Sequence, residues 1–378
     1  MSGRAVLLAA SLGLAGSAIL QTILANATPR IAADFADPAA YTWVSASYLI
    51  ASAATLPIFA QLTDRVGCRR VFLLGHACFA LGAVGVAAAP SLPLFLAARV
   101  IQGIGAGAVG PAALAMIGVT YTADVRNRAM GQIAVVQVVA NVIGPLLGGW
   151  FIDGPGWRLG VLAPVPLSLV ALSLIRHVPT RTAAPRWWRL SLGEQGDLLR
   201  GPLRKHVSLS GIAGAVGLST ITYAPIALQD VQGLSATATG WMLLAMLVAM
   251  GMGSGAASRL AATRAVRPAG WALALVGAPL VAVPMPGVTA LGLALVGLGL
   301  GLITPLVLVD AQRAAPPEHL AQAGGLAQLG RTAGAASAVP ALGLTIGLGT
   351  PLPRAIPVIF GAIAAICAVG LVLNRRES

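Results

Sequence analysis

Charged side chains are scarce in this sequence: 9% of its 378 residues are Asp, Glu, Lys or Arg, whereas soluble proteins carry roughly 25%. Acidic residues are rarer than basic ones, with 11 Asp and Glu against 24 Lys and Arg. Hydrophobic residues make up 57% of the chain. Water does not solvate so large an apolar fraction, so the composition excludes a soluble globular protein and indicates one that lies in lipid.

Cysteine and histidine are also sparse. The three cysteines, Cys68, Cys78 and Cys367, show neither a disulfide framework nor metal-ligand spacing. The four histidines offer no nucleophile–base arrangement. We therefore expect no metal, no cofactor and no enzymatic activity. The net charge of +13 lies in short loops rather than on one basic face, so we expect no nucleic-acid partner either.

Long apolar runs dominate what remains. Twelve of them are long enough to cross about 30 Å of hydrocarbon. They are expected at residues 5–27, 42–62, 71–89, 92–119, 130–152, 159–175, 207–228, 239–257, 269–286, 288–309, 321–347 and 353–373. The first run also resembles a cleaved secretory signal, but its length of about 22 residues suits a membrane span better. The sequence predicts an all-α membrane protein with twelve transmembrane helices.

The distribution of basic residues fixes an orientation. If both termini are cytoplasmic, nearly all Arg and Lys fall on the cytoplasmic side, and only Arg30, Arg158 and Arg354 fall outside. The positive-inside rule therefore favours a multi-pass protein of the plasma membrane (the inner membrane of a bacterium) with both termini in the cytoplasm. Anionic lipid is the expected partner at that face.

A polar stretch separates the runs into two groups of six. We expect an N-terminal six-helix bundle over residues 1–177, a cytoplasmic linker over 178–206 and a C-terminal six-helix bundle over 207–378. The linker contains Arg186-Trp187-Trp188-Arg189 followed by several leucines. This pattern is typical of an amphipathic helix on the membrane surface, although a flexible linker explains it equally well.

The two halves repeat each other. One group of small residues recurs 194 positions later: Gly103, Gly105, Gly107 and Pro111 correspond to Gly297, Gly299, Gly301 and Pro305. Pro29 and Pro225 form another pair, in the first helix of each half. Two pseudo-symmetric six-helix bundles are the plan of a transporter whose halves rock around a central substrate site.

Four stretches carry more specific patterns. Residues 21–31 read QTILANATPRI, residues 60–70 read AQLTDRVGCRR, residues 99–105 read RVIQGIG, and residues 141–149 read NVIGPLLGG. They resemble motifs of the major facilitator superfamily, specifically of its drug:proton antiporter branch. The resemblance implies a monomeric secondary transporter that works by alternating access and exports small amphipathic molecules or drugs in exchange for protons.

The resemblance also implies roles for individual residues. A cytoplasmic gating motif is expected at Asp64, Arg65, Gly67, Arg69 and Arg70, with Asp124 in the next cytoplasmic loop. Asp64 lies at a helix end and suits the partial positive charge of a helix N-terminus, and Arg69 and Arg70 suit Asp124. The antiporter motif of the fifth helix is expected at Gly144, Pro145, Gly148 and Gly149, where small residues and a proline let a helix flex against its neighbour.

The sequence departs from the family pattern at three positions. Ala60 replaces the leading glycine of the gating motif, and Cys68 replaces a basic residue. Leu20 stands where this branch normally has an aspartate in the first helix. The usual proton-carrying carboxylate is therefore missing.

Polar side chains inside the membrane are costly and mark candidate functional sites. The candidates for the substrate cavity and for coupling are Gln21, Asn26, Arg99, Gln102, Gln137, Asn141, Gln328 and Arg331. No Asp or Glu lies in the middle of a predicted span, so a cavity lined by two arginines and amides should repel cations and favour anionic, zwitterionic or neutral substrates. Proton coupling would then need Asp34, Asp310 or the substrate itself.

Other interpretations stay open at this point. The two arginines could instead bond to backbone carbonyls and only shape the bundle. The protein could be an uptake permease for an organic anion, which the buried arginines favour. It could also be a transport-inactive membrane sensor or partner, which the missing aspartate and the altered gating motif favour.

Overall fold

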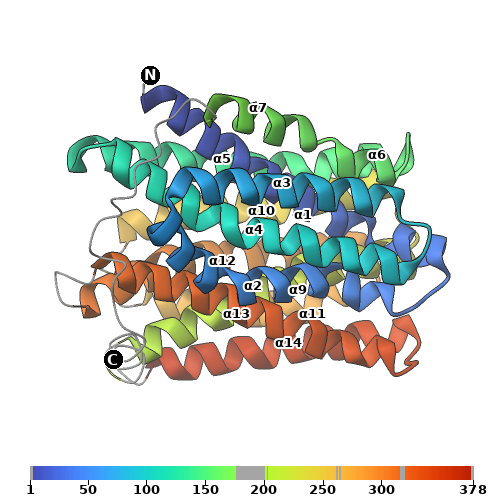
Figure 1. The fold of residues 1–378 in the computed structure, drawn as a ribbon. Coiled ribbons are helices and arrows are strands. Elements are labelled where there is room, and N and C mark those ends of the chain that lie inside the picture. Colours follow the sequence, from blue (N-terminus) through green and yellow to red (C-terminus); the bar gives the residue numbers. More distant parts are fainter. Residues whose placement is uncertain are drawn as a thin grey trace. The chain divides into compact units, whose positions relative to one another are not determined.

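The computed structural model describes residues 3–175, 201, 203–260, 263, 265–315 and 320–375, and no β-strand occurs among them. The chain divides into two compact units, Met1–Trp188 and Arg189–Ser378. Unit 1 contains α1 (Gly3–Phe35), α2 (Ala40–Val66), α3 (Cys68–Ala88), α4 (Leu92–Thr120), α5 (Ala123–Asp153), α6 (Trp157–Leu162) and α7 (Val165–Ile175). Unit 2 contains α9 (Arg204–Ile226), the π-helix η2 (Ala227–Val231), α10 (Ala236–Leu260), α11 (Val266–Val281), α12 (Pro286–Ala314), α13 (Leu320–Gly347) and α14 (Leu352–Arg375) (Figure 1).

Helices occupy all twelve predicted spans, which confirms the all-α membrane fold. Ten segments of the described chain are long and apolar enough to cross a membrane. The other two predicted spans correspond to α11, which is apolar but has only 16 residues, and to α13. Glycine, alanine and polar side chains such as Arg331 make α13 the less hydrophobic of the two. In a bilayer, the polar side chains of such a helix must contact protein, water or substrate rather than lipid.

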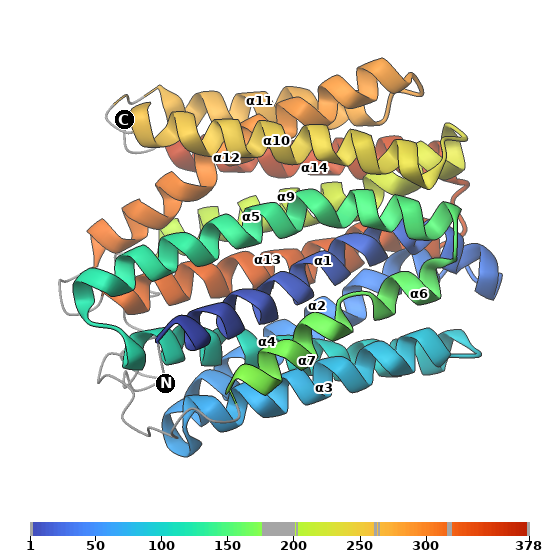
Figure 2. The ribbon, with the colours of Figure 1, turned by 90° about the horizontal axis from the view of Figure 1, so that it is seen from above.

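The same helix pairs pack together inside each unit, which confirms the predicted pseudo-symmetry. In unit 1, α1 packs on α5, and α4 packs on both α2 and α3 (Figure 1). In unit 2, α9 packs on α13, and α12 packs on both α10 and α11 (Figure 2). The pair of α1 and α7 likewise has its counterpart in α9 and α14. The repeat found in the sequence is thus a repeat of packing.

Some helix boundaries differ from the prediction. The sixth span is interrupted after Leu162, because Pro164 lacks the N–H that would continue the helix. Conversely, α1 continues through Pro29 to Phe35, beyond the expected end at residue 27. Proline is tolerated there because neighbouring helices can satisfy the backbone groups that it leaves free.

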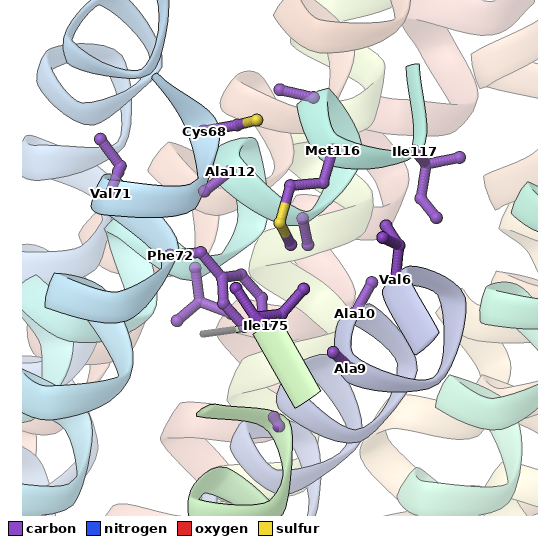
Figure 3. Close-up of a cluster of buried hydrophobic side chains, with 14 of the residues drawn as sticks. Val6, Ala9, Ala10, Cys68, Val71, Phe72, Ala112, Met116, Ile117 and Ile175 are labelled. Carbon is purple, nitrogen blue, oxygen red and sulfur yellow. The ribbon is translucent and has the colours of Figure 1, made fainter. Parts of the chain in front are cut away.

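A cluster of buried apolar side chains from α1, α3, α4, α5 and α7 lies inside unit 1 (Figure 3). The ring of Phe72 lies in this cluster, 4.1 Å between centroids from the ring of His76. The Nδ1 of His76 donates a hydrogen bond of 3.0 Å to the carbonyl of Phe72. Gly13 of α1 leaves the space that this imidazole fills, since a Cβ there would collide with the ring.

The predicted linker falls almost wholly outside the described residues, because residues 176–200 and 202 are not among them. The surface helix around Arg186-Trp187-Trp188-Arg189 and the boundaries 1–177, 178–206 and 207–378 therefore stay predictions.

Candidate functional site

Arg99 lies at the centre of a polar cluster in unit 1. The residue is 1% exposed. Its Nε donates a 2.9 Å hydrogen bond to the carbonyl of Val44 on α2, and its Nη1 donates a 2.5 Å bond to Oε1 of Gln102, one turn along α4. The guanidinium carbon also lies 4.4 Å from the centre of the Tyr48 ring. A carbonyl, an amide and an aromatic face thus surround this buried cation.

This cluster contains no carboxylate. Among the described residues, no ion pair involves Arg99. Both Arg99 and Gln102 are fully buried, and Nε2 of Gln102 has no hydrogen-bond partner in the described part of the chain. The bond to the Val44 carbonyl agrees with the alternative in which Arg99 bonds to the backbone and shapes the bundle. Sequence reasoning missed Tyr48, because its role depends on how α2 packs against α4.

The antiporter motif of α5 packs directly on the first-helix motif of α1. Gly144 faces Thr22 so closely that a Cβ at Gly144 would collide with the threonine side chain. A Cβ at Gly148 would lie 3.1 Å from the Cα of Ile23. Nδ2 of Asn26 donates a 3.2 Å hydrogen bond across the interface to the carbonyl of Pro145. The glycines therefore let the backbones of α1 and α5 approach each other, and the hydrogen bond from Asn26 to Pro145 links the two helices.

An equivalent hydrogen bond between helices exists in unit 2, between α9 and α13. The hydroxyl of Tyr223 donates a 2.5 Å hydrogen bond to the carbonyl of Val339. Val339 is the repeat counterpart of Pro145, 194 positions later, and it precedes Pro340. In both units the first helix therefore donates a hydrogen bond to the equivalent carbonyl of the fifth helix. The donor is an amide in unit 1 and a phenol in unit 2. No sequence signal singled out Tyr223.

The contribution of the Tyr223 hydrogen bond to stability can be tested directly. We expect Tyr223→Phe to lower the stability of the protein by about 0.5–1.5 kcal/mol, since the bond from the hydroxyl to the Val339 carbonyl is lost and the ring keeps its packing. The measurement is the thermal midpoint of unfolding in detergent. Phe360 is buried in the same unit and lacks a hydroxyl, so Phe360→Leu serves as a packing control. An unchanged midpoint for Tyr223→Phe would show that the bond carries no stability.

The predicted cavity residues fall into two groups. Asn26, Arg99 and Gln102 are buried and bonded within unit 1. The rest are at least partly exposed, and their side chains make no hydrogen bond, ion pair or ring contact with any residue that the structure describes: Gln21, Gln137, Asn141, Gln328 and Arg331. Polar groups in membrane helices that lack a protein partner are the ones available to water or a ligand.

Gln21, Gln137 and Asn141 belong to neighbouring helices of unit 1. Gln137 and Asn141 are one turn apart on α5. Gln21 precedes Thr22, which contacts Gly144 one turn after Asn141. Gln21 and Asn141 therefore lie at similar depths along α1 and α5, and Gln137 lies one turn earlier on α5. In unit 2, Gln328 and Arg331 are likewise one turn apart on α13.

The two carboxylates considered for proton coupling are both paired. Asp34 of α1 accepts a 2.7 Å hydrogen bond from Nε1 of Trp157 and lies 3.5 Å from Arg30 and 3.4 Å from Arg158. Asp310 of α12 accepts bonds of 2.8 and 2.7 Å from Nε and Nη2 of Arg267 on α11. Either carboxylate would have to leave its arginine before it could carry a proton.

The predicted gating motif is only partly described. Gly67 joins α2 to α3 with φ of 94°, a backbone conformation that favours glycine. Arg65 and Arg70 are exposed, and Arg69 is partly buried. The side chains of Asp64 and Asp124 lie outside the described residues, so the pairs expected for them stay predictions.

Comparison with known proteins agrees with this architecture. A family model described as Major Facilitator Superfamily matches residues 10–339. The efflux pump dotC of Dothistroma septosporum is 34% identical over 170 residues, which cover 45% of this chain and 29% of the pump. Multidrug resistance protein 3 of Bacillus subtilis is 34% identical over 174 residues, which cover 46% of this chain and 34% of that protein. The chain spans about a third of the length of these curated relatives.

A solved structure supports the same conclusion about the fold. The bacterial homologue of the human lysosomal transporter Spinster superposes with a TM-score of 0.80 at 16% identity, over 98% of this chain and 95% of that chain. At this identity the likeness shows the fold alone. Because the family model covers most of the sequence, the assignment follows: the chain belongs to the Major Facilitator Superfamily.

Proposed function

We propose that this protein is a secondary active transporter that exports small amphipathic molecules by alternating access, coupled to protons. The observation that carries the proposal is the α1–α5 interface, where Gly144, Pro145 and Gly148 let the antiporter-motif helix approach the first helix. The names of the relatives in Dothistroma septosporum and Bacillus subtilis, an efflux pump and a multidrug resistance protein, support the same function.

The interface suits a helix that must bend during a transport cycle. Proline inside α5 removes one helical hydrogen bond, which weakens the helix at that turn. The bond from Asn26 to the carbonyl of Pro145 keeps the weakened turn attached to α1. α13 contains Pro340 beside the carbonyl that Tyr223 holds, so the corresponding helix of unit 2 has the same construction.

We further propose the bacterial inner membrane as the location, with both termini in the cytoplasm and the gating motif on that face. Tryptophans support the position of the opposite interface. Trp43, Trp150 and Trp241 are 41%, 60% and 60% exposed and lie near the helix ends that are expected outside. Tryptophan prefers the membrane–water boundary.

Inside-out membrane vesicles test the proposal. With an imposed pH gradient, acid inside, we expect the vesicles to accumulate amphipathic dyes or drugs in the direction that corresponds to export. Collapse of the gradient with a protonophore should abolish the accumulation. A strain without the gene should be more sensitive to a panel of toxic compounds. Gradient-independent leakage of all compounds alike would contradict a coupled exporter.

Uptake of an organic anion is a second candidate function, because Arg331 is a cation without a described protein partner. Growth of the deletion strain on sole carbon sources separates the two directions. A growth defect on organic acids with unchanged drug sensitivity would favour uptake. Normal growth and normal sensitivity would leave a transport-inactive sensor or partner.

A further inference from the structure

Arg331 is a cation near the middle of α13 that packs on α9 and whose charge no described residue neutralises. Its carbonyl and Cγ pack against Gly214 of α9, where a Cβ would collide with both. The side chain is partly exposed, and its guanidinium makes no hydrogen bond, ion pair or ring contact within the described part of the chain. Arg99, by contrast, has a carbonyl, an amide and an aromatic ring around it.

The described helices offer this cation no carboxylate at its depth. Every Asp in them lies within two turns of a helix end. An arginine in the membrane interior is costly unless an opposite charge or several acceptors surround it. Arginine also keeps its proton, so it cannot remove the cost by becoming neutral. No described residue supplies the missing negative charge, and a bound anionic ligand would supply it.

We propose that Arg331 binds the anionic group of the transported molecule, and that the carrier exchanges one organic anion for another faster than it moves one alone. The inference rests on the alternating access of the proposed function. Gln328, one turn before Arg331 and also without a described partner, can donate to a polar group of the same ligand. When the site is empty, an unpaired cation must be enclosed during reorientation, which slows that step. One anion in each direction leaves the net charge movement at zero.

Binding is tested with the purified full chain in lipid nanodiscs. The probes are salicylate, naphthalenesulfonate and octyl phosphate as amphipathic anions, and tetraphenylphosphonium as a cation. We expect at least one anion, and not the cation, to raise the thermal midpoint of unfolding. Arg331→Gln should weaken binding of that anion by roughly 10- to 100-fold, as expected for a hydrogen bond to a charged group.

Two variants serve as controls for this binding test. Arg331→Lys keeps the charge and should retain part of the affinity, whereas Arg313→Gln alters an exposed arginine at the end of α12 and should change nothing. The proposal is overturned if none of the three anions binds, or if Arg331→Gln binds as the unmodified chain does.

Exchange is tested in proteoliposomes loaded with the radiolabelled form of the anion that binds. Efflux should be about tenfold faster when the same unlabelled anion is present outside, and Arg331→Gln should lose this stimulation. Equal rates with and without outside anion would refute the exchange. If a pH gradient drives ethidium transport while anions are ignored, the proposed export stands and this inference fails. If nothing is transported, the proposed function fails, and the melting experiment still decides whether Arg331 binds an anion.

Discussion

Gly144→Ala is expected to destabilise the protein by about 1–3 kcal/mol and to abolish most transport, although alanine favours helices more than glycine does. The new Cβ would collide with the side chain of Thr22 and would lie 3.3 Å from the carbonyl of Ile19, so α1 and α5 would have to separate. Separation would also stretch the bond from Asn26 to the carbonyl of Pro145, which lies in the same interface. The measurements are the thermal midpoint in detergent and the initial rate of dye export.

The chain offers a matched control for this substitution. Gly131 also belongs to α5, but a Cβ there would meet nothing within 4 Å. Gly131→Ala should therefore leave stability unchanged or raise it slightly. Thr22→Ala removes the colliding hydroxyl, so the double variant with Gly144→Ala should recover part of the loss, with a coupling energy of about 0.5–3 kcal/mol. Equal midpoints for Gly144→Ala and Gly131→Ala would show that close packing of α1 and α5 is unimportant.

Gln102→Leu is expected to destabilise unit 1 more than removal of the arginine that it binds. Leucine would leave the buried Arg99 guanidinium without the acceptor that its Nη1 uses, at a cost of about 1.5–3 kcal/mol for a hydrogen bond to a charged group. Arg99→Met removes the charge itself, so no unpaired cation remains. Replacing both partners with apolar residues should cost less than Gln102→Leu alone, because no buried polar group is then left without a partner in this pair.

Thermal midpoints of the two single variants and the double variant measure this order. Gln102→Glu should preserve stability, since a carboxylate can accept the same bond from Arg99. Gln132→Leu makes the same change at an exposed position of α5 and should have little effect on stability. A double variant less stable than Gln102→Leu would refute the idea that the unpaired charge dominates.

The fold could be predicted because its main cause is local. A bilayer requires every spanning segment to satisfy its own backbone, so each apolar run of sufficient length becomes a helix. The repeat of Gly103 and Gly107 at Gly297 and Gly301 also indicated the packing correctly. A Cβ at any of these four glycines would collide with the second helix of the same half, α2 in unit 1 and α10 in unit 2. The interruption at Pro164 was missed because proline within a membrane helix often leaves the helix intact, as Pro29 does.

The site was predicted as a set of residue types but not as a set of contacts. The cost of polar groups in lipid identified Arg99 and Arg331 together, yet their environments differ completely. Arg99 reaches a carbonyl 55 positions earlier in the chain, and only the packing of α4 on α2 brings that acceptor within range. Tyr223 was overlooked for the same reason, since its partner lies 116 positions away. The sequence shows which side chains can donate. It does not show which backbone carbonyl accepts, because every residue has one.

The shared acceptor position in α5 and α13 has a consequence for how the two halves can diverge. A main-chain carbonyl is present whatever side chain its residue bears, so the acceptor survives any substitution that keeps the helix. Only the donor can be lost by a side-chain substitution, and the donor is an amide in one half and a phenol in the other. Two ancestral copies could therefore lose all sequence identity at this contact and still retain it. Alignments of the halves by residue type would score Asn26 and Tyr223 as unrelated, while a comparison of hydrogen-bond acceptors would match them.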